Sequence, residues 1–295
     1  MDIVHHAFIG GVGFMGLAAQ EQELTGLGFL VGSVFPDLDV LFIAAGKRFY
    51  LKHHQGPTHS LPLAPFYAAA FASIPALQMG WSWALFLSIF AGLAIHVLLD
   101  LFNTFGIRLF WPLTKRRHCL DAVFFIDTVT LVLTATFFAI VTAKLVSPGI
   151  AVIGYAALFV MYFLGKLALQ RHVRALMSVD FAIPSAWNPF GFFLFTRRDG
   201  RLETSTYNAL SNRVSAIQVT PGTSPDVVEL ARRSPVFCDM ESILRGLSIT
   251  RVEKNNDGIS IVAQDLAVRN FGGKFGRTEV RFDRDGRLIH EMANI

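Results

Sequence analysis

Long apolar runs alternate with short polar segments through the first 170 residues of the chain. A helix needs roughly 20 apolar residues to cross a bilayer. Four runs come near or exceed this length: residues 61–79, 81–102, 122–146 and 149–169. Two shorter runs precede them, at 7–19 and 27–45, and the second contains Pro36, where we expect a break into two helical pieces. The pattern predicts an α-helical polytopic membrane domain with about four transmembrane helices plus two short or broken N-terminal helices.

After residue 177 the helical pattern gives way to short, mostly alternating runs. Runs rich in β-forming residues lie at 192–196, 247–252, 259–263 and 278–282. Asp-Gly pairs, which favour hairpin turns, lie at 199–200, 257–258 and 285–286. Ser224-Pro225-Asp226 is a typical helix start. We therefore expect two domains: a membrane-embedded helical domain at 1–177 and a small β-rich domain at 178–295.

The composition agrees with a membrane protein. Of the 295 residues, 53% are hydrophobic and only 16% are charged, whereas a soluble domain usually carries about 25% charged residues. The shortfall is uneven, because residues 1–170 hold nearly all the long apolar runs. The length therefore fits a membrane part followed by one soluble domain of ordinary size.

Basic residues indicate which side of the membrane each loop faces. They gather in three segments that the order of the spans places on one side: Lys47, Arg48 and Lys52; Arg108 and Lys115, Arg116, Arg117; Arg171 and Arg174. The opposite loops, around Gly80 and 147–149, carry no charge. The positive-inside rule then makes the basic side, with the C-terminal domain, cytoplasmic. Topology and contact with membrane lipid account for the net charge of +4, so we expect no nucleic-acid partner.

His96 and Asp100 are the most informative polar residues in the apolar runs. An ionisable group at the bilayer centre costs about 2.5–3.5 kcal/mol on insertion scales, so each needs a reason to be there. The two residues are four positions apart on an apolar helix and share one face. This spacing suits two ligands of one cation, and it equally suits a buried His–Asp hydrogen bond between helices.

Other His and Asp residues fall near the same membrane face. Asp37 follows Pro36, where it is either a ligand or an acid at a helix start. His54 and His59 flank a Gly-Pro turn in a basic loop, and His6 precedes the first apolar run. Because the charge-based topology gathers all of these at the cytoplasmic side, we expect a shared site for a divalent metal ion, with zinc favoured over manganese and one or two ions bound. The candidate ligands are His6, Asp37, His54, His59, His96 and Asp100.

The order of these motifs resembles a known family, the YdjM-like predicted membrane-bound metal-dependent hydrolases. The resemblance covers residues 1–130 strongly and the β-rich part loosely. It rests on these segments, in this order: His6-Ala7-Phe8-Ile9-Gly10, Pro36-Asp37-Leu38-Asp39, residues 54–60, His96 to Asp100, residues 104–113, Leu120-Asp121 and residues 125–127. The resemblance implies a multi-pass protein of the bacterial inner (cytoplasmic) membrane with hydrolase activity. This chain departs from the pattern at Gln55, where the family usually has Arg, so one implied anion contact is missing.

We expect a hydrolase that acts on a lipid or amphiphilic phosphoester, because a site at the membrane face suits such a substrate. The catalytic candidates are Asp39 and Asp121, as a general base or as a residue that orients a ligand. Three arginines could hold a phosphate, or could equally reflect topology and contact with anionic lipid: Arg108, Arg116 and Arg117.

Two non-enzymatic functions use the same residues. A transporter could carry metal ions or protons through them, but it would need polar groups at mid-membrane or on both sides. Here only Lys144 and Lys166 depart from the one-sided arrangement, and both can extend toward an interface. A regulatory scaffold could hold a structural metal and bind a partner through its β-rich domain. A closed coordination sphere, with no position for water, would favour the scaffold.

Overall fold

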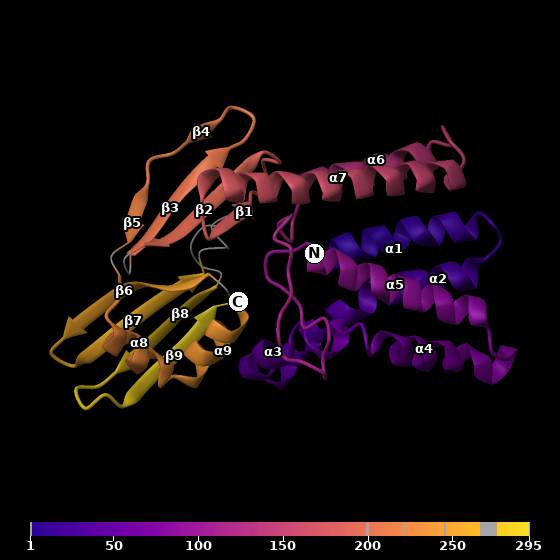
Figure 1. The fold of residues 1–295 in the computed structure, drawn as a ribbon. Coiled ribbons are helices and arrows are strands. Elements are labelled where there is room, and N and C mark those ends of the chain that lie inside the picture. The colour runs from indigo at the N-terminus through magenta and orange to yellow at the C-terminus, as the bar shows by residue number, and fades with distance from the viewer. Residues whose placement is uncertain (1, 199–200, 221, 245, 266–275, 295) are drawn as a thin grey trace. The chain divides into compact units, whose positions relative to one another are not determined.

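The computed structural model describes residues 2–198, 201–220, 222–244, 246–265 and 276–294. The chain divides into two compact units. The first comprises Met1–Gln170 with Ala186–Pro189, and the second comprises Arg171–Ser185 with Phe190–Ile295. The first unit is helical and the second is rich in β-strands, so the coarse architecture expected from the sequence is confirmed (Figure 1).

The helical unit folds from consecutive helices that run back and forth. Its elements are α1 (Ile3–Ala18), α2 (Glu23–Val34), the 3-10 helix η1 (Phe35–Ala45), α3 (Lys47–His53), the 3-10 helix η2 (Pro57–His59), α4 (Ala64–Met79), α5 (Trp83–Leu101), α6 (Thr128–Thr142) and most of α7 (Pro148–Met177), whose residues from Arg171 onward belong to the second unit. In Figure 1, α1, α2, α4 and α5 lie side by side. The start of α1, the loops before α4 and the end of α5 consequently meet at one end of this unit.

Glycines allow α2 and α5 to pack backbone against backbone. A Cβ atom on Gly32 would overlap the carbonyl oxygen of Ile89, and one on Gly92 would overlap that of Phe29. Small residues permit such close approach between apolar helices. A small-residue face also packs α4 on α5, through Ala64, Ala68 and Ala72. These contacts fix the end of α5, which carries His96 and Asp100.

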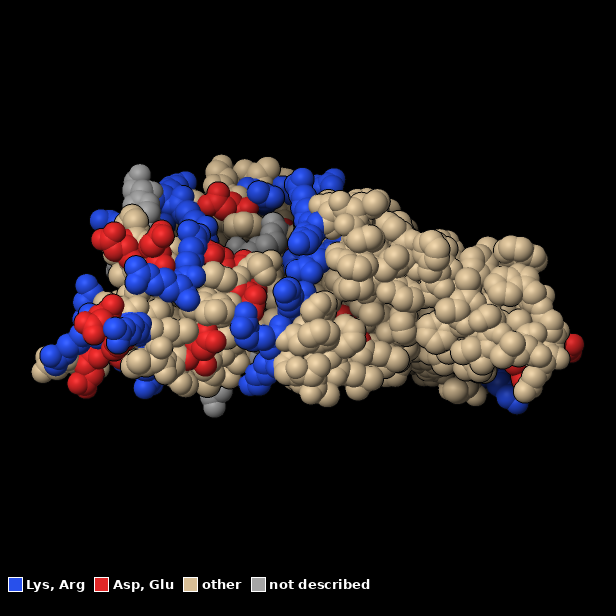
Figure 2. Space-filling view, turned by 90° about the horizontal axis from the view of Figure 1, so that it is seen from below, with Lys and Arg blue, Asp and Glu red and all other residues tan. Residues whose placement is uncertain are grey.

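Within the described ranges, three helices are long and apolar enough to cross a membrane: Glu23–Ala45, Trp83–Leu101 and Pro148–Met177. A fourth span arises if the pair Lys47–His59 and Ala64–Met79, bent by 80°, counts as one. Figure 2 shows a broad area over the helical unit with few charged side chains. At Pro36 the α-helix gives way to a 3-10 helix, but Glu23–Ala45 still counts as one candidate span, so the expected separation into two helical pieces is only partly present.

The apolar run 122–146 differs from expectation. Only Thr128–Thr142 is helical, and these 15 residues are too few for a span. The start of the run is not helical: the backbone N–H groups of Ala122 and Val123 donate to the carbonyl oxygen of Phe102. Ala122, Val123 and Phe124 are fully buried within the protein. Their apolar character therefore reflects the protein interior rather than lipid.

The second unit contains two antiparallel sheets. The first sheet contains β1 (Phe181–Pro184), β2 (Gly191–Arg198), β3 (Arg201–Asn208), β4 (Arg213–Val214) and β5 (Gln218–Thr220); its order is β1-β2-β3-β4, with β5 also paired to β3. The second is a meander of β6 (Leu247–Asn255), β7 (Gly258–Asp265), β8 (Arg277–Phe282) and β9 (Leu288–Asn294). Two helices, α8 (Pro225–Arg232) and α9 (Pro235–Ile243), contribute Val227, Ala231 and Phe237 to a core with β7 and β8.

All four β-forming runs lie in strands, namely β2, β6, β7 and β8, and the expected helix start is the start of α8. The Asp-Gly pair at 257–258 joins β6 to β7, and Gly286, at φ 75°, lies between β8 and β9. The third pair, at 199–200, lies outside the described residues. The sequence did not predict β1, β3, β4, β5 or β9, which lack a clear alternating apolar pattern. It also did not predict the short helix α9.

Candidate metal centre

Four side chains from three parts of the helical unit converge at one point. They are Asp37 of η1, His59 of η2, and His96 and Asp100 near the end of α5. Each offers one ligand atom, and these four atoms all lie within 4.8 Å of one another. Asp37 is 9% exposed and the other three are fully buried. The structure thus brings together four of the six ligands expected from the sequence.

The separations between the ligand atoms match those around a small cation. The Nε2 atom of His59 lies 3.2 Å from Asp100 Oδ2, 3.2 Å from the Nε2 atom of His96 and 3.5 Å from Asp37 Oδ1. His96 Nε2 lies 3.6 Å from each of the same two carboxylate oxygens. Ligands about 2.0–2.1 Å from a tetrahedral zinc ion lie about 3.3–3.4 Å apart.

Hydrogen bonds on the far side of His96 determine which ring nitrogen can bind a cation. Its Nδ1 atom lies 2.7 Å from the backbone carbonyl oxygen of Ser33. A carbonyl only accepts, so Nδ1 carries the proton and donates it. The lone pair of Nε2 then faces the cluster, as in metal-binding histidines, whose other nitrogen donates to a carbonyl or a carboxylate.

His59 is oriented in the same way by Asp39. The Nδ1 atom of His59 lies 3.0 Å from the Thr58 hydroxyl and 3.6 Å from Asp39 Oδ2. The Thr58 hydroxyl donates in turn to Asp39 Oδ2 at 3.2 Å. Because these partners accept from His59, its Nε2 lone pair also faces the cluster. Two imidazole lone pairs 3.2 Å apart beside two carboxylates form an arrangement that a cation or shared protons must stabilise.

Asp39 accepts hydrogen bonds from the loop that carries His54 and Thr58, and it is not one of the four clustered ligands. Its side chain is buried and accepts from His54 Nδ1 at 2.8 Å and from the backbone N–H of Gln55 at 2.8 Å, in addition to Thr58. The sequence left open whether Asp39 is a base or an orienting residue. Its hydrogen bonds favour the orienting role, because both oxygens are already engaged.

His54 and His6 lie next to the four ligands but outside that group. The Nδ1 atom of His54 donates to Asp39, and its side chain is 26% exposed. The Nε2 atom of His6 lies 3.2 Å from Asp100 Oδ1, and its ring stacks on that of His96 with centroids 3.6 Å apart. His6 thus contacts the second oxygen of a ligand carboxylate and orients it.

Two of the three candidate arginines donate hydrogen bonds to the loop that carries His54 and His59 (the histidine loop). Arg117 donates to the carbonyl oxygen of His54 at 3.0 Å, to Gln55 Oε1 at 3.2 Å and to the carbonyl oxygen of Gly106 at 2.8 Å. Arg108 donates to the carbonyl oxygen of Lys52 at 3.0 Å. Burial and the nearby charge of Arg108 lower the pKa of Arg117 to about 10, so it remains charged at neutral pH.

The remaining predicted residues lie in the segment after α5. Asp121 is 8% exposed, has a φ of 54° and lies outside the four-residue group. Arg116 is exposed. The Nε atoms of both Arg108 and Arg117 are buried with no hydrogen-bond partner among the described residues. These two Nε–H groups are enclosed by protein, so an anion would be attracted by the charge of the guanidinium groups rather than bound at Nε.

A second buried polar cluster lies between α6 and α7. Asp127 caps α6 through the N–H of Thr130, and the Tyr162 hydroxyl donates to both its oxygens, at 2.8 and 2.9 Å. Lys166, expected to extend toward an interface, is instead buried and donates to the carbonyl oxygen of Pro189 at 2.8 Å.

Sequence reasoning did not identify Ser33 and Thr58, which orient His96 and His59 in the metal centre. Ser33 acts through its backbone and Thr58 through a common polar side chain, so neither leaves a distinctive signal in the sequence.

Comparison with known proteins places this chain in a family. The sequence model of the YdjM inner membrane protein family matches residues 1–173, more than half of the chain. The chain belongs to the YdjM inner membrane protein family. The matched YdjM region contains every residue of the four-ligand cluster. It also contains Gln55, whose side chain accepts from Arg117, so this YdjM protein still has a guanidinium group beside the loop.

A curated relative resembles about half of this YdjM chain. The protein described as "Uncharacterized protein YfhP" from Bacillus subtilis (strain 168) is 29% identical over 152 residues. These residues are 49% of this chain and 45% of that relative, so the match spans less than half of the relative's length. No solved structure resembles the chain significantly.

Proposed function

We propose that this protein is a membrane-bound, divalent-metal-dependent hydrolase that acts on a lipid or amphiphilic phosphoester at the cytoplasmic membrane face. One observation carries the proposal: the Nε2 lone pairs of His59 and His96 face each other at 3.2 Å, between two carboxylates. A buried group of hydrogen-bond acceptors without donors is unfavourable, and a bound cation would compensate for it. The chain belongs to an inner membrane protein family, and this membership agrees with a substrate in or at the membrane.

The donor set fits zinc or manganese. Two imidazole nitrogens and two carboxylate oxygens are ligands that both ions accept, and zinc commonly takes four ligands at the observed spacing. Asp37 Oδ2 is buried without a hydrogen-bond partner among the described residues, which leaves further ligand capacity on this side. When bound, a divalent ion would supply Lewis acidity that acidifies a water molecule and polarises a phosphoryl oxygen.

The surrounding residues would position groups and move protons. Asp39 fixes His54 through Nδ1, so the lone pair of His54 Nε2 is available at the partly exposed edge of the site. An Asp–His pair of this kind can accept a proton from water and return it to a leaving group. Asp121 is the alternative proton acceptor. The positive charges of Arg108 and Arg117 beside the loop would attract a phosphate group.

The placement of the cluster supports a surface enzyme over a transporter. Asp37, His59, His96 and Asp100 all lie where α4 begins and α5 ends, at one end of the helical unit. A carrier would need comparable groups along the path or at the opposite end. A hydrolase for amphiphilic substrates needs its site only where headgroups lie.

Hydrolysis by the reconstituted protein tests the activity. Vesicles containing the protein, loaded with zinc or manganese, are given a panel of phospholipids and a soluble phosphodiester, and phosphate or headgroup release is measured. We expect release by the wild type, none from His96→Ala, and about 100-fold slower release from His54→Gln with metal retained. His290→Gln, at an exposed histidine of β9, is the matched control and should match the wild type. No release by the metal-loaded wild type on any substrate would contradict the proposal.

A structural metal is the second candidate function. It is favoured by the presence of four protein ligands, because structural zinc sites are closed by four ligands whereas catalytic sites usually keep a position for water. A metal-loaded protein that hydrolyses nothing, yet unfolds at a much lower temperature when the metal is removed, would support this function instead.

A further inference from the structure

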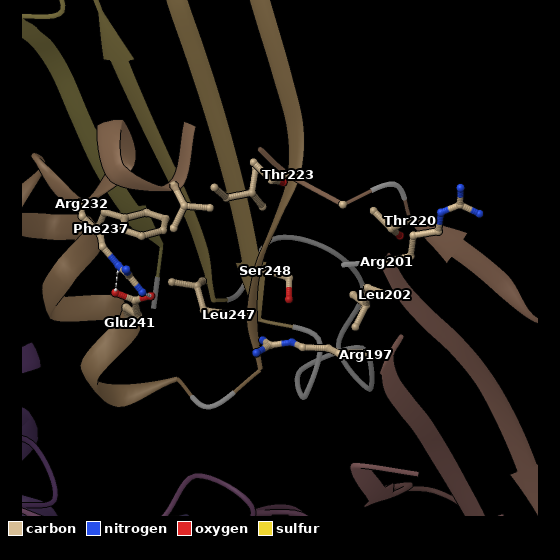
Figure 3. A pocket seen from close by; sticks show the side chains of 13 residues that line it. Arg197, Arg201, Leu202, Thr220, Thr223, Arg232, Phe237, Glu241, Leu247 and Ser248 are labelled. Atoms are coloured by element: carbon tan, nitrogen blue, oxygen red, sulfur yellow. Dashed lines mark hydrogen bonds and ion pairs between the residues drawn. The ribbon is translucent and has the colours of Figure 1, made fainter. Parts of the chain in front are cut away.

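The second unit contains a cavity that the metal centre does not explain. It has a volume of about 270 Å³ and lies among the β2–β3 hairpin, the segment before α8, the two helices and the start of β6 (Figure 3). Its lining mixes apolar side chains, among them Phe237 and Leu247, with polar ones, among them Arg197, Thr220 and Ser248. All of these residues belong to the second unit, so the cavity is independent of the metal centre.

Arg197 directs its charge into this cavity. In Figure 3 its side chain extends from β2 toward Ser248, whereas the Arg201 side chain turns outward. Asp180 accepts from the backbone N–H of Arg197 at 2.8 Å. Across the described part of the chain, no carboxylate forms an ion pair with the Arg197 guanidinium group.

The acidic group of the cavity is already neutralised. Glu241 accepts two hydrogen bonds from Arg232, from Nε at 3.0 Å and from Nη2 at 2.8 Å. This bidentate pairing fixes the carboxylate against its own cation. The cavity therefore combines a guanidinium group without an ion-pair partner among the described residues, a hydroxyl group toward which it extends, and the apolar side chains of Leu247 and Phe237.

We propose that this cavity binds a small phosphate monoester, with its phosphate on Arg197 and Ser248 and its organic part against Leu247 and Phe237. A planar guanidinium group is suited to phosphate oxygens, and a hydroxyl adds one neutral donor. The volume is just below the usual range of small-molecule pockets, roughly 300–1,000 Å³, so the ligand is small. A soluble phosphate ester and the headgroup of an anionic lipid share this chemistry.

Calorimetric titration of the full chain in a phosphate-free detergent tests the site, with glycerol phosphate as the probe and inorganic phosphate for comparison. We expect Arg197→Gln to weaken glycerol phosphate binding by about tenfold or more, as loss of a charged hydrogen-bonded contact does. Ser248→Ala should weaken it by about threefold, as loss of a neutral hydrogen bond does. The matched control is Arg198→Gln, which removes the same charge from the adjacent position of β2, on the other face of the strand.

The outcomes separate the site from general charge attraction. Loss in Arg197→Gln with full binding in Arg198→Gln supports the proposal. No binding by the wild type at millimolar probe, or equal weakening by both substitutions, would overturn it. Repeating the titration in phosphatidylcholine nanodiscs with and without phosphatidate then identifies the source. Weaker probe binding when phosphatidate is present indicates the lipid headgroup, and unchanged binding indicates the soluble ester.

Discussion

Asp39 shows how one buried carboxylate can organise a site without contacting the ion. It accepts from His54, from the backbone of Gln55 and from Thr58, and Thr58 in turn accepts from His59. We expect Asp39→Asn to lower metal affinity by about 10–100-fold, because residues that orient ligands usually contribute this much. Competition with a chromophoric chelator measures the affinity.

Two further variants make the Asp39 prediction specific. Thr58→Val removes one link of the same network and should produce a smaller loss in the same direction. Asp257→Asn, in the exposed β6–β7 turn, should leave the affinity unchanged. An Asp39→Asn protein that folds and binds metal as tightly as the wild type would show that the network does not orient the ligands.

Arg116 and Arg117 are adjacent in sequence and should differ sharply in their effect on stability. Arg117 is buried and donates to three oxygens around the histidine loop, whereas Arg116 is exposed. Arg117→Gln should lower the free energy of unfolding by about 2 kcal/mol or more, and Arg116→Gln should change it by less than about 0.5 kcal/mol. Denaturant unfolding in detergent measures both, and equal effects would contradict the bracing role.

The sequence predicted which residue types form the site, but not which of them meet. The spacing of His96 and Asp100 on one helix face was enough to pair them. The position of His59 relative to His54 depends on the conformation of the loop between them, in which Gln55 adopts a φ of 54°. A sequence pattern cannot distinguish a histidine that donates to Asp39 from one whose lone pair faces the ligands, because that depends on tertiary hydrogen bonds.

At the scale of helices, the packing of α2 on α5 positions the site. Gly32 lies directly against the backbone of α5. It precedes Ser33, whose carbonyl oxygen accepts a hydrogen bond from His96. Gly32→Ala should destabilise the protein by about 1–3 kcal/mol, as overpacking does, and should also lower metal retention. Gly165→Ala on α7, where no atom lies within 4 Å of the added Cβ, is the control. Thermal unfolding and metal content measure both effects, and similar results for the two variants would contradict this packing account.

Sequence periodicity predicted best those elements whose apolar run coincides with one helix. The run 81–102 contains α5 (Trp83–Leu101), which is capped by Ser82. The run 122–146 did not, because its first residues are buried in protein and Asp127 begins the helix with a side-chain cap. Hydrophobicity alone does not distinguish lipid from protein interior. Short strands such as β4 and β5 pair with β3 through the backbone and therefore leave little pattern in the sequence.

For the whole molecule, the proposed orientation places the basic loops and the second unit in the cytoplasm. With Cys119 and Cys238 replaced by Ser, single cysteines at Ser147 and Arg174, near opposite ends of the candidate span α7, should label from opposite sides of the membrane. A membrane-impermeant maleimide added to intact cells should modify Ser147→Cys, and Arg174→Cys only after the membrane is opened. The reverse pattern would contradict the topology derived from the positive-inside rule.

The most direct test of the account is the metal content of the detergent-purified protein. Elemental analysis compares the wild type with His96→Ala and Asp37→Asn, and with the exposed controls His290→Ala and Asp257→Asn. We predict near-stoichiometric zinc or manganese in the wild type and in both controls, and its loss in both cluster variants. A wild type that holds no metal even after reconstitution with zinc and manganese would contradict the central claim and leave a buried polar network in its place.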